Sequence, residues 1–90
     1  MMKNLGIDIG GSFIKFGLVE EDNLIHNTQI PNNVTSIVEF KSTIKPILEG
    51  LLNRFTPESI GIGFPGTIDD SGNIISAPNM KYWETENIRI

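Results

Sequence analysis

The chain has 90 residues, with seven lysines and arginines against eleven aspartates and glutamates, so its net charge is −4 at pH 7. A chain of this length folds as one small domain with a thin core. Its basic residues are not concentrated in any stretch, which argues against nucleic-acid binding, and no apolar run reaches the length of a membrane span or signal peptide. The sequence contains no cysteine, which suits the cytosol, so we expect a cytoplasmic protein without nucleic-acid or membrane partners.

Two strands are expected at the start of the chain, on either side of a glycine turn. Apolar residues alternate with other residues over 3–9 and again over 13–20, and a period of two indicates strands. Between them Gly10, Gly11 and Ser12 can take positive φ and present backbone N–H groups. A tight turn or an anion-binding nest requires both properties.

Charged residues flank this turn, with Asp8 before it and Lys15 on the second strand. An acidic side chain beside a phosphate is repelled unless a cation lies between them, which favours a Mg²⁺ ion held by the Asp8 carboxylate and water. Lys15 can neutralise a phosphate, although a solvated lysine on a strand face is the alternative. A strand follows the glycines where a P-loop or a dinucleotide fingerprint needs a helix, so neither motif is present. Taken alone, the motif is also compatible with an ordinary β-hairpin.

A third strand over 24–30 completes a three-stranded antiparallel meander after a polar turn. Ser36 and Glu39 then have the spacing of a capping box at the start of a helix. One face of this helix is apolar and should cover the sheet; its members are Ile37, Phe40, Ile44, Ile47, Leu48, Leu51 and Phe55. Pro46 lies inside the helix at a cost of about 3 kcal/mol, so we expect a kink or a break near Ile44.

A fourth strand is expected over 60–64. It is short and apolar, as in a strand covered on both faces, and the helical crossover makes it parallel to the first strand. Its carboxyl end leads into Pro65 and Gly66, close to the first glycine turn, and ligands of open α/β sheets gather outside such strand ends. The turn at 69–73 contains two aspartates and fits a solvated turn better than a metal site. A β-extension over 74–76 follows.

The glycine turn after the first strand and the loop after the fourth strand form two motifs. Their sequences and their order resemble the N-terminal part of the ROK family of sugar kinases and sugar-responsive repressors, within the actin, hexokinase and heat-shock chaperone ATPase superfamily. The family's first phosphate motif, Asp-x-Gly-Gly-Thr-x-x-Lys, is matched with serine in place of threonine by Asp8, Gly10, Gly11, Ser12 and Lys15. Its second pattern, G-x-G-x-P-G followed by a hairpin, an Asn-Leu pair and Trp, is matched with methionine in place of leucine by Gly61, Gly63, Pro65, Gly66, Asn79, Met80 and Trp83. The resemblance covers nearly the whole chain.

The resemblance implies an α/β fold class, a partial ribonuclease H-like (actin-like ATPase) domain. In it a three-stranded antiparallel meander is followed by a crossover helix and a parallel fourth strand. ROK proteins have two α/β domains with the active site between them, which takes a longer chain. We therefore expect residues 1–90 to be an N-terminal fragment of the first domain, with the second domain absent. The family's catalytic base, an Asp in an Asn-Asp pair, and the His and Cys residues of its zinc site would lie outside this chain.

By the same resemblance the parent protein transfers a phosphoryl group from ATP to a hexose, glucose-like by family frequency, with Mg²⁺ at the phosphates. The residues expected to bind ATP are Asp8, Gly10, Gly11, Ser12 and Lys15, and Asp8 is also expected to be the Mg²⁺ ligand. The residues expected to bind the sugar are Gly66, Thr67 and Asn79. No catalytic residue is expected in this fragment, so we predict that it is inactive alone. Repressors of the family carry a helix-turn-helix ahead of the phosphate motif, and the few residues that precede it here favour a kinase.

A non-enzymatic alternative stays open, namely a sugar-sensing regulator or a truncated binding module. Exposed sheet-edge and helix surface would favour self-association, and we expect a homo-oligomer. Residues 63–66 also resemble polyphosphate glucokinases, so the donor stays open between ATP and polyphosphate, as does the identity of the sugar. His26 is expected on the sheet surface rather than in catalysis. Trp83 and Tyr82 either stack on a sugar or pack near the β-extension.

Overall fold

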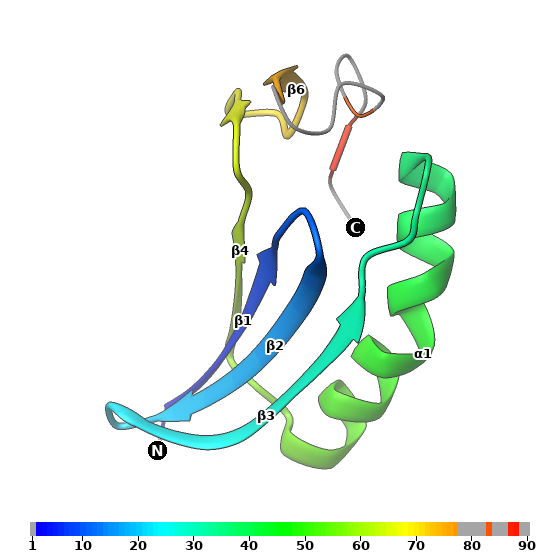
Figure 1. The fold of residues 1–90 in the computed structure, drawn as a ribbon. Helices are drawn as coiled ribbons and strands as arrows, with labels where there is room; N and C mark the ends of the chain where they lie inside the picture. Colours follow the sequence, from blue (N-terminus) through cyan, green and yellow to red (C-terminus); the bar gives the residue numbers. More distant parts are fainter. Residues whose placement is uncertain (1, 78–82, 84–86, 89–90) are drawn as a thin grey trace.

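The computed structural model describes residues 2–77, 83, 87 and 88, which form a sheet covered on one face by a helix (Figure 1). The main sheet contains β1 (Lys3–Ile9), β2 (Phe13–Glu20), β3 (Asn23–Pro31) and β4 (Ser59–Gly63). The remaining elements are the helix α1 (Ile37–Phe55) and a hairpin of β5 (Thr67–Ile68) and β6 (Ile74–Ser76). The order across the sheet is β3-β2-β1-β4, so β1 lies between β2 and β4.

The strand pairing follows from the alternation of the sequence. β1 pairs antiparallel with β2 and parallel with β4, and β2 pairs antiparallel with β3. In β1 every second residue is buried, namely Leu5, Ile7 and Ile9, because successive side chains of a strand lie on opposite faces. These three side chains share one core cluster with the apolar face of α1. The predicted meander, crossover helix and parallel fourth strand are confirmed.

The helix α1 begins at the predicted cap and buries the predicted face. The Ser36 hydroxyl oxygen accepts a hydrogen bond from the Glu39 backbone N–H at 3.1 Å, which satisfies a donor that has no partner within the helix. The expected break near Ile44 is wrong, because the helix continues through Pro46 to its end. Pro46 is exposed. The carbonyl that loses its helical partner there, that of Ser42, therefore lies on the solvent side, where water can replace it.

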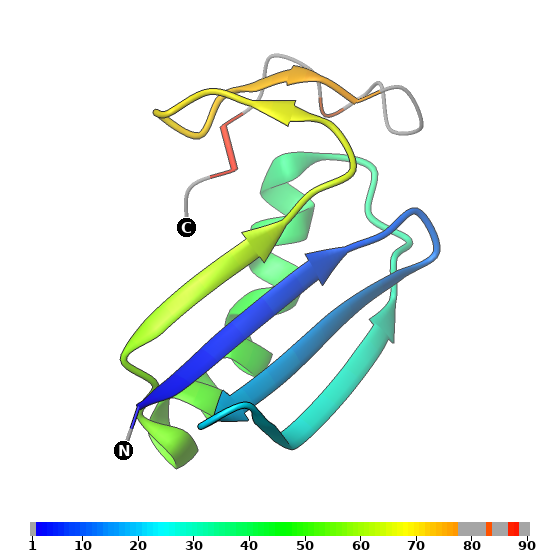
Figure 2. The ribbon, with the colours of Figure 1, turned by 90° about the vertical axis from the view of Figure 1, so that its left-hand side faces the viewer.

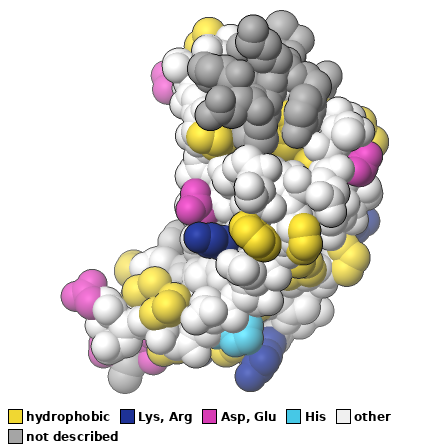
Figure 3. Space-filling model, in the orientation of Figure 1, with side chains coloured by type: hydrophobic (Ala, Val, Ile, Leu, Met, Phe, Trp, Pro, Cys, Tyr) yellow, Lys and Arg dark blue, Asp and Glu magenta, His cyan; other side chains and the backbone are white. Residues whose placement is uncertain are grey.

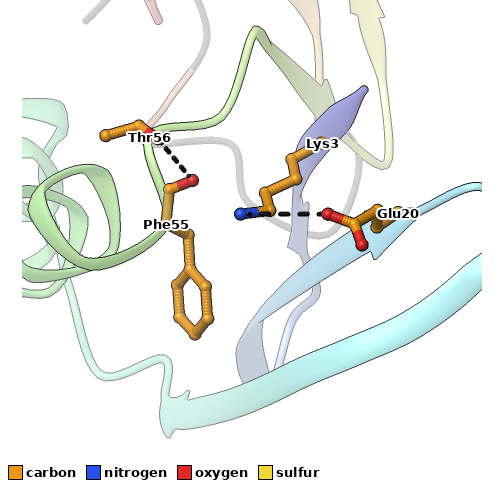
Figure 4. Close-up of polar contacts among 4 residues, drawn as sticks. All are labelled: Lys3, Glu20, Phe55 and Thr56. Atoms are coloured by element: carbon orange, nitrogen blue, oxygen red, sulfur yellow. Dashed lines mark hydrogen bonds and ion pairs between the residues drawn. The ribbon is translucent and has the colours of Figure 1, made fainter. Parts of the chain in front are cut away.

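The helix ends beside the start of the sheet (Figure 4). Thr56 takes a left-handed φ of 46° and its N–H donates to the Leu52 carbonyl at 3.0 Å, as in an αL cap. Two residues later the Glu58 N–H donates to the Lys3 carbonyl at 2.8 Å, which aligns β4 beside β1. Lys3 Nζ also lies 3.8 Å from Glu20 Oε2, a partly exposed pair worth about 1 kcal/mol or less.

The edge strand β4 is more exposed than the sequence suggested. Figure 2 shows α1 behind the sheet, and among the described residues no helix covers the opposite face. All five residues of β4 are exposed, and even Ile60 and Ile62, which share a face with buried residues of β1, are 45% and 36% exposed. The expectation of a strand covered on both faces is therefore wrong for this structure. A short apolar strand indicates burial only when other elements reach it.

The β5–β6 hairpin extends the core beyond the strand ends. Trp83 is fully buried, with its ring 4.9 Å from that of Phe40 and 5.7 Å from that of Phe64, measured between centroids. Of the two roles considered for Trp83, the structure therefore gives it the packing role. Tyr82 lies outside the described residues.

The helix in the described part of the chain is not long and apolar enough to cross a membrane.

Candidate functional site

The two sequence motifs meet at the end of the sheet where β1 and β4 have their carboxyl termini. β1 and β4 run parallel, with Asp8 directly opposite Gly63, so the loops that follow them leave from the same edge (Figure 2). The first loop is the Gly10–Ser12 turn, and the second leads through Pro65 into the β5–β6 hairpin. The carboxyl ends of parallel strands are where α/β sheets bind ligands.

Asp8 and Lys15 stand directly opposite each other on β1 and β2. Both are exposed, and each alternates with buried neighbours, so they lie on the face that points away from α1. On the other side of Asp8, a Cβ built at Gly63 would lie 3.4 Å from Asp8 Oδ1. The carboxylate thus lies beside bare backbone of β4, with a lysine on the opposite strand, and this leaves room for a charged ligand.

The Gly10–Ser12 turn is held by hydrogen bonds of its own and by Asn32. The Gly10 N–H donates to the Phe13 carbonyl at 2.8 Å, which closes the turn. Neither glycine has a φ in the left-handed region, so the expected positive φ is wrong for this turn. Gly10 matters here for space instead, because a Cβ at this position would lie 3.1 Å from the Phe13 carbonyl oxygen, whereas the space beside Gly11 is open.

Asn32 is a site residue that the sequence did not reveal. Its side-chain Nδ2 donates to the Gly10 carbonyl at 2.7 Å, and its backbone N–H donates to the Ser12 carbonyl at 2.8 Å. It follows the proline that ends β3 and lies 22 positions from Gly10. Asparagine after proline is typical of a loop, so only the strand pairing could have identified this contact.

The face of the sheet away from α1 is hollowed. An open hollow of about 890 Å³ follows this face, and its lining includes Asp8 and Lys15. Its floor is low where three glycines lie side by side on neighbouring strands, since Gly6 is opposite both Gly17 and Gly61. In Figure 3 the molecule is indented on the left, the side away from α1. A broad, open surface therefore adjoins the charged pair.

The second loop is shaped by close backbone contacts. The Gly66 N–H donates to the Phe64 carbonyl at 2.9 Å, and a Cβ built at Gly66 would overlap the Ser76 carbonyl oxygen. Gly66 is thus required by packing, whatever it binds. Thr67, the first residue of β5, is exposed and lies opposite Ser76. The third expected sugar contact, Asn79, lies outside the described residues.

The side chain of Asp69 makes its hydrogen bonds within its own turn. Asp69 accepts hydrogen bonds from the Asn73 N–H and the Ser71 N–H, both at 2.9 Å, and from Asn73 Nδ2 at 3.1 Å. These bonds, those of Asn73 first, lower the pKa of the Asp69 carboxyl below its ordinary value of 3.8. The carboxylate therefore stabilises its own turn, in agreement with the prediction of a turn at 69–73.

The acidic residues near the turn allow one metal ligand. Within the part of the chain that the structure describes, no group of three or more His, Cys, Asp or Glu residues could hold a metal ion. A Mg²⁺ ion needs no such cluster when substrate phosphates and water complete its shell, and one carboxylate such as that of Asp8 suffices. His26 lies elsewhere, on β3 of the sheet as expected, with its ring 5.2 Å from that of Phe55 near the end of α1.

Comparisons with known proteins identify the family of the chain. The family model described as ROK family matches residues 4–89. A glucokinase of Thermotoga maritima is 32% identical over 88 residues, which cover 91% of this chain and 27% of that glucokinase. The chain thus spans about a quarter of the length of this relative.

Solved structures share the fold. The crystal structure of a ROK family glucokinase from Streptomyces griseus in complex with glucose and AMPPNP is similar with a TM-score of 0.78 and 26% identity, over 96% of this chain and 28% of the other. An inorganic polyphosphate/ATP-glucomannokinase from Arthrobacter sp. strain KM gives a TM-score of 0.79 and 27% identity, over 98% and 38%. The expected fold class, a partial ribonuclease H-like (actin-like ATPase) domain, is confirmed. With a family model that matches almost its whole length, the chain belongs to the ROK family.

Proposed function

We propose that these 90 residues are the N-terminal part of the first domain of a sugar kinase, which transfers a phosphoryl group from ATP to a glucose-like hexose. The observation that carries the proposal is the pairing of Asp8 and Lys15 beside the Gly10–Ser12 turn, at the edge where the second loop also emerges. The names of the relatives support it. The Thermotoga maritima protein is a glucokinase, and the Streptomyces griseus enzyme was crystallised with glucose and AMPPNP.

The charged pair and the turn have separate roles in this proposal. Lys15 and the backbone N–H groups of Gly11 and Ser12 bind phosphate oxygens of the nucleotide. Asp8 holds Mg²⁺ through its carboxylate and water, and the ion screens the carboxylate from the phosphates. Phosphoryl transfer depends mainly on such positioning and charge neutralisation. The polyphosphate/ATP-glucomannokinase among the similar structures keeps polyphosphate as an alternative donor.

The second loop contributes to the sugar side of the site. Thr67 presents an exposed hydroxyl just beyond the loop, and Gly66 holds the backbone close to β6. Both stand where the family pattern places sugar contacts, and Asn79 completes the set. The family's catalytic base, an Asp in an Asn-Asp pair, is expected outside this chain, so these 90 residues alone are proposed to be inactive.

The test measures sugar-dependent ADP release over a panel of hexoses, with the protein at its full natural length. Asp8→Asn removes the charge that holds Mg²⁺ at nearly constant shape, and we expect activity to fall by at least about 10²-fold. Asp70→Asn makes the same change at an exposed turn carboxylate and should leave activity unchanged. Sugar binding without turnover would favour a regulator instead, and full activity of the Asp8→Asn variant would refute the assigned metal site.

A further inference from the structure

We infer that Asn32 is a positioning residue that holds the Gly10–Ser12 turn in the shape that receives a phosphate. The inference rests on the proposed function, because it assigns a partner to the same site. Asn32 makes two hydrogen bonds to this turn, from Nδ2 to the Gly10 carbonyl at 2.7 Å and from its backbone N–H to the Ser12 carbonyl at 2.8 Å. It therefore fixes the direction of two carbonyl groups that lie two residues apart.

Fixing a carbonyl also fixes the N–H group of the same peptide unit. A trans peptide is planar, and its C=O and N–H point in opposite directions. The bond from Asn32 Nδ2 to the Gly10 carbonyl thus turns the Gly11 N–H away from Asn32. In the same way, the bond from the Asn32 backbone to the Ser12 carbonyl sets the direction of the Phe13 N–H.

The Gly11 N–H is the group that a phosphate can use. Among the described residues it makes no hydrogen bond, whereas the Gly10 N–H is occupied by the Phe13 carbonyl. Gly11 is exposed, and the space beside its Cα is open where a side chain would otherwise stand. An exposed N–H group in the turn that joins the strands of Asp8 and Lys15 suits an anion with an associated cation.

The peptide between Gly10 and Gly11 needs such a clamp. Glycine has no Cβ to restrict its φ and ψ, so a peptide with glycine on both sides rotates more easily than any other. The side chain of Asn32 makes the bond that holds this particular peptide. Any other residue except proline at position 32 would keep the backbone bond to Ser12 but would lose the bond to Gly10 unless its side chain could donate.

The experiment compares steady-state kinetics of Asn32→Ala and Asn32→Leu with Asn33→Ala, in the protein at its full natural length. Leucine resembles asparagine in shape but cannot donate, and Asn33 is its exposed neighbour. Loss of one hydrogen bond should raise the KM for the phosphoryl donor about 2- to 12-fold in both Asn32 variants. The KM for the sugar should not change. Asn32→Ser keeps a donor and should recover part of the loss relative to Asn32→Ala.

The outcomes separate this inference from the proposed function. If the wild-type protein shows no turnover and no binding of MgATP or polyphosphate, both fail. If it is active but the Asn32 variants match Asn33→Ala, only the positioning role fails. A role in folding alone would lower kcat through a smaller active fraction and leave the donor KM unchanged, and that result would also overturn the inference.

Discussion

At the scale of single residues, close packing constrains some positions of the candidate site and charge constrains others. Gly66 is constrained by the Ser76 carbonyl, and Asp8 and Lys15 by their direct opposition on neighbouring strands. Gly61 lies in β4 and has open space around its Cα. The glycines of the second motif are therefore not equivalent, although the sequence pattern treats them alike.

Gly66→Ala should destabilise the fold by about 1–3 kcal/mol, because its Cβ would overlap the backbone of β6 and the ring of Phe64. Urea unfolding monitored by the fluorescence of Trp83, the only tryptophan, measures this, since its ring packs against Phe64. Gly61→Ala is the matched control and should be neutral or slightly stabilising. Equal midpoints for the two variants would contradict the packing argument.

The stability of the turn around Asp69 should depend on pH. The pKa of Asp69 is lowered on folding, so the stabilisation from its carboxylate is present above 3.8 and is lost as the pH falls through the lower, folded value. NMR titration of the Ser71 and Asn73 amide protons should follow this loss. Asp69→Asn carries no titrating group and should remove the dependence, and the same titration in that variant would point to another group.

Sequence reasoning worked at this scale where a motif carried the information. Asp8, Gly10, Gly11, Ser12 and Lys15 are contiguous enough to form a pattern, and the structure brings them together. Asn32 is distant in sequence and of a type common in turns, so no pattern contained it. The φ angles of the glycines were also beyond the sequence, because glycine permits both signs and the pairing of β1 with β2 decides between them.

At the scale of elements, local signals predicted the boundaries well. β1, β2 and β6 have the predicted bounds, and α1 has the predicted cap and buried face. Pro46 was misjudged because its penalty was considered without its position. An exposed proline in a helix of 19 residues can be tolerated when apolar packing on the other face is sufficient.

The sequence of the turn between β2 and β3 is not the most stable one for its backbone conformation. Glu21 and Asp22 have φ values of 48° and 67°, the positive values that a type I′ hairpin turn requires of both central residues. Replacing them with Asn-Gly should stabilise the fold by about 1 kcal/mol, since this pair accepts such angles with little strain. Thermal unfolding should then shift upward by about 4–8 °C. Asp22→Val should act in the opposite direction, because a β-branched residue is strongly disfavoured at positive φ.

At the scale of the whole molecule, the fold leaves one sheet face uncovered within the described residues, and the two edge strands, β3 and β4, each have a strand neighbour on one side only. α1 covers one face, and β4 has a neighbour only on the β1 side. The sequence predicted the order of elements but not this exposure, because burial depends on what packs against an element. The apolar composition of β4 is the same whether or not another layer covers it.

The exposed edge should make the isolated 90-residue chain self-associate. Ile60 and Ile62 present apolar side chains along an unpaired strand edge, and such edges pair with other chains. Sedimentation equilibrium should show a concentration-dependent increase in mass, and Ile62→Lys should weaken it. Ile75→Lys, at a position 60% exposed on the β5–β6 hairpin, should not. A wild-type chain that stays monomeric at high concentration would refute this prediction.

The parallel pairing of β1 with β4 also decides when the site can exist during synthesis on the ribosome. β1, β2 and β3 are consecutive, so the meander with Asp8, Lys15 and the glycine turn can form early. Gly63, which lies opposite Asp8, is synthesised only after the whole of α1. A nascent chain released before β4 would carry the phosphate turn without the backbone beside its carboxylate. The pairing of Asp8 with Gly63 at the candidate site can therefore form only after β4 has left the exit tunnel.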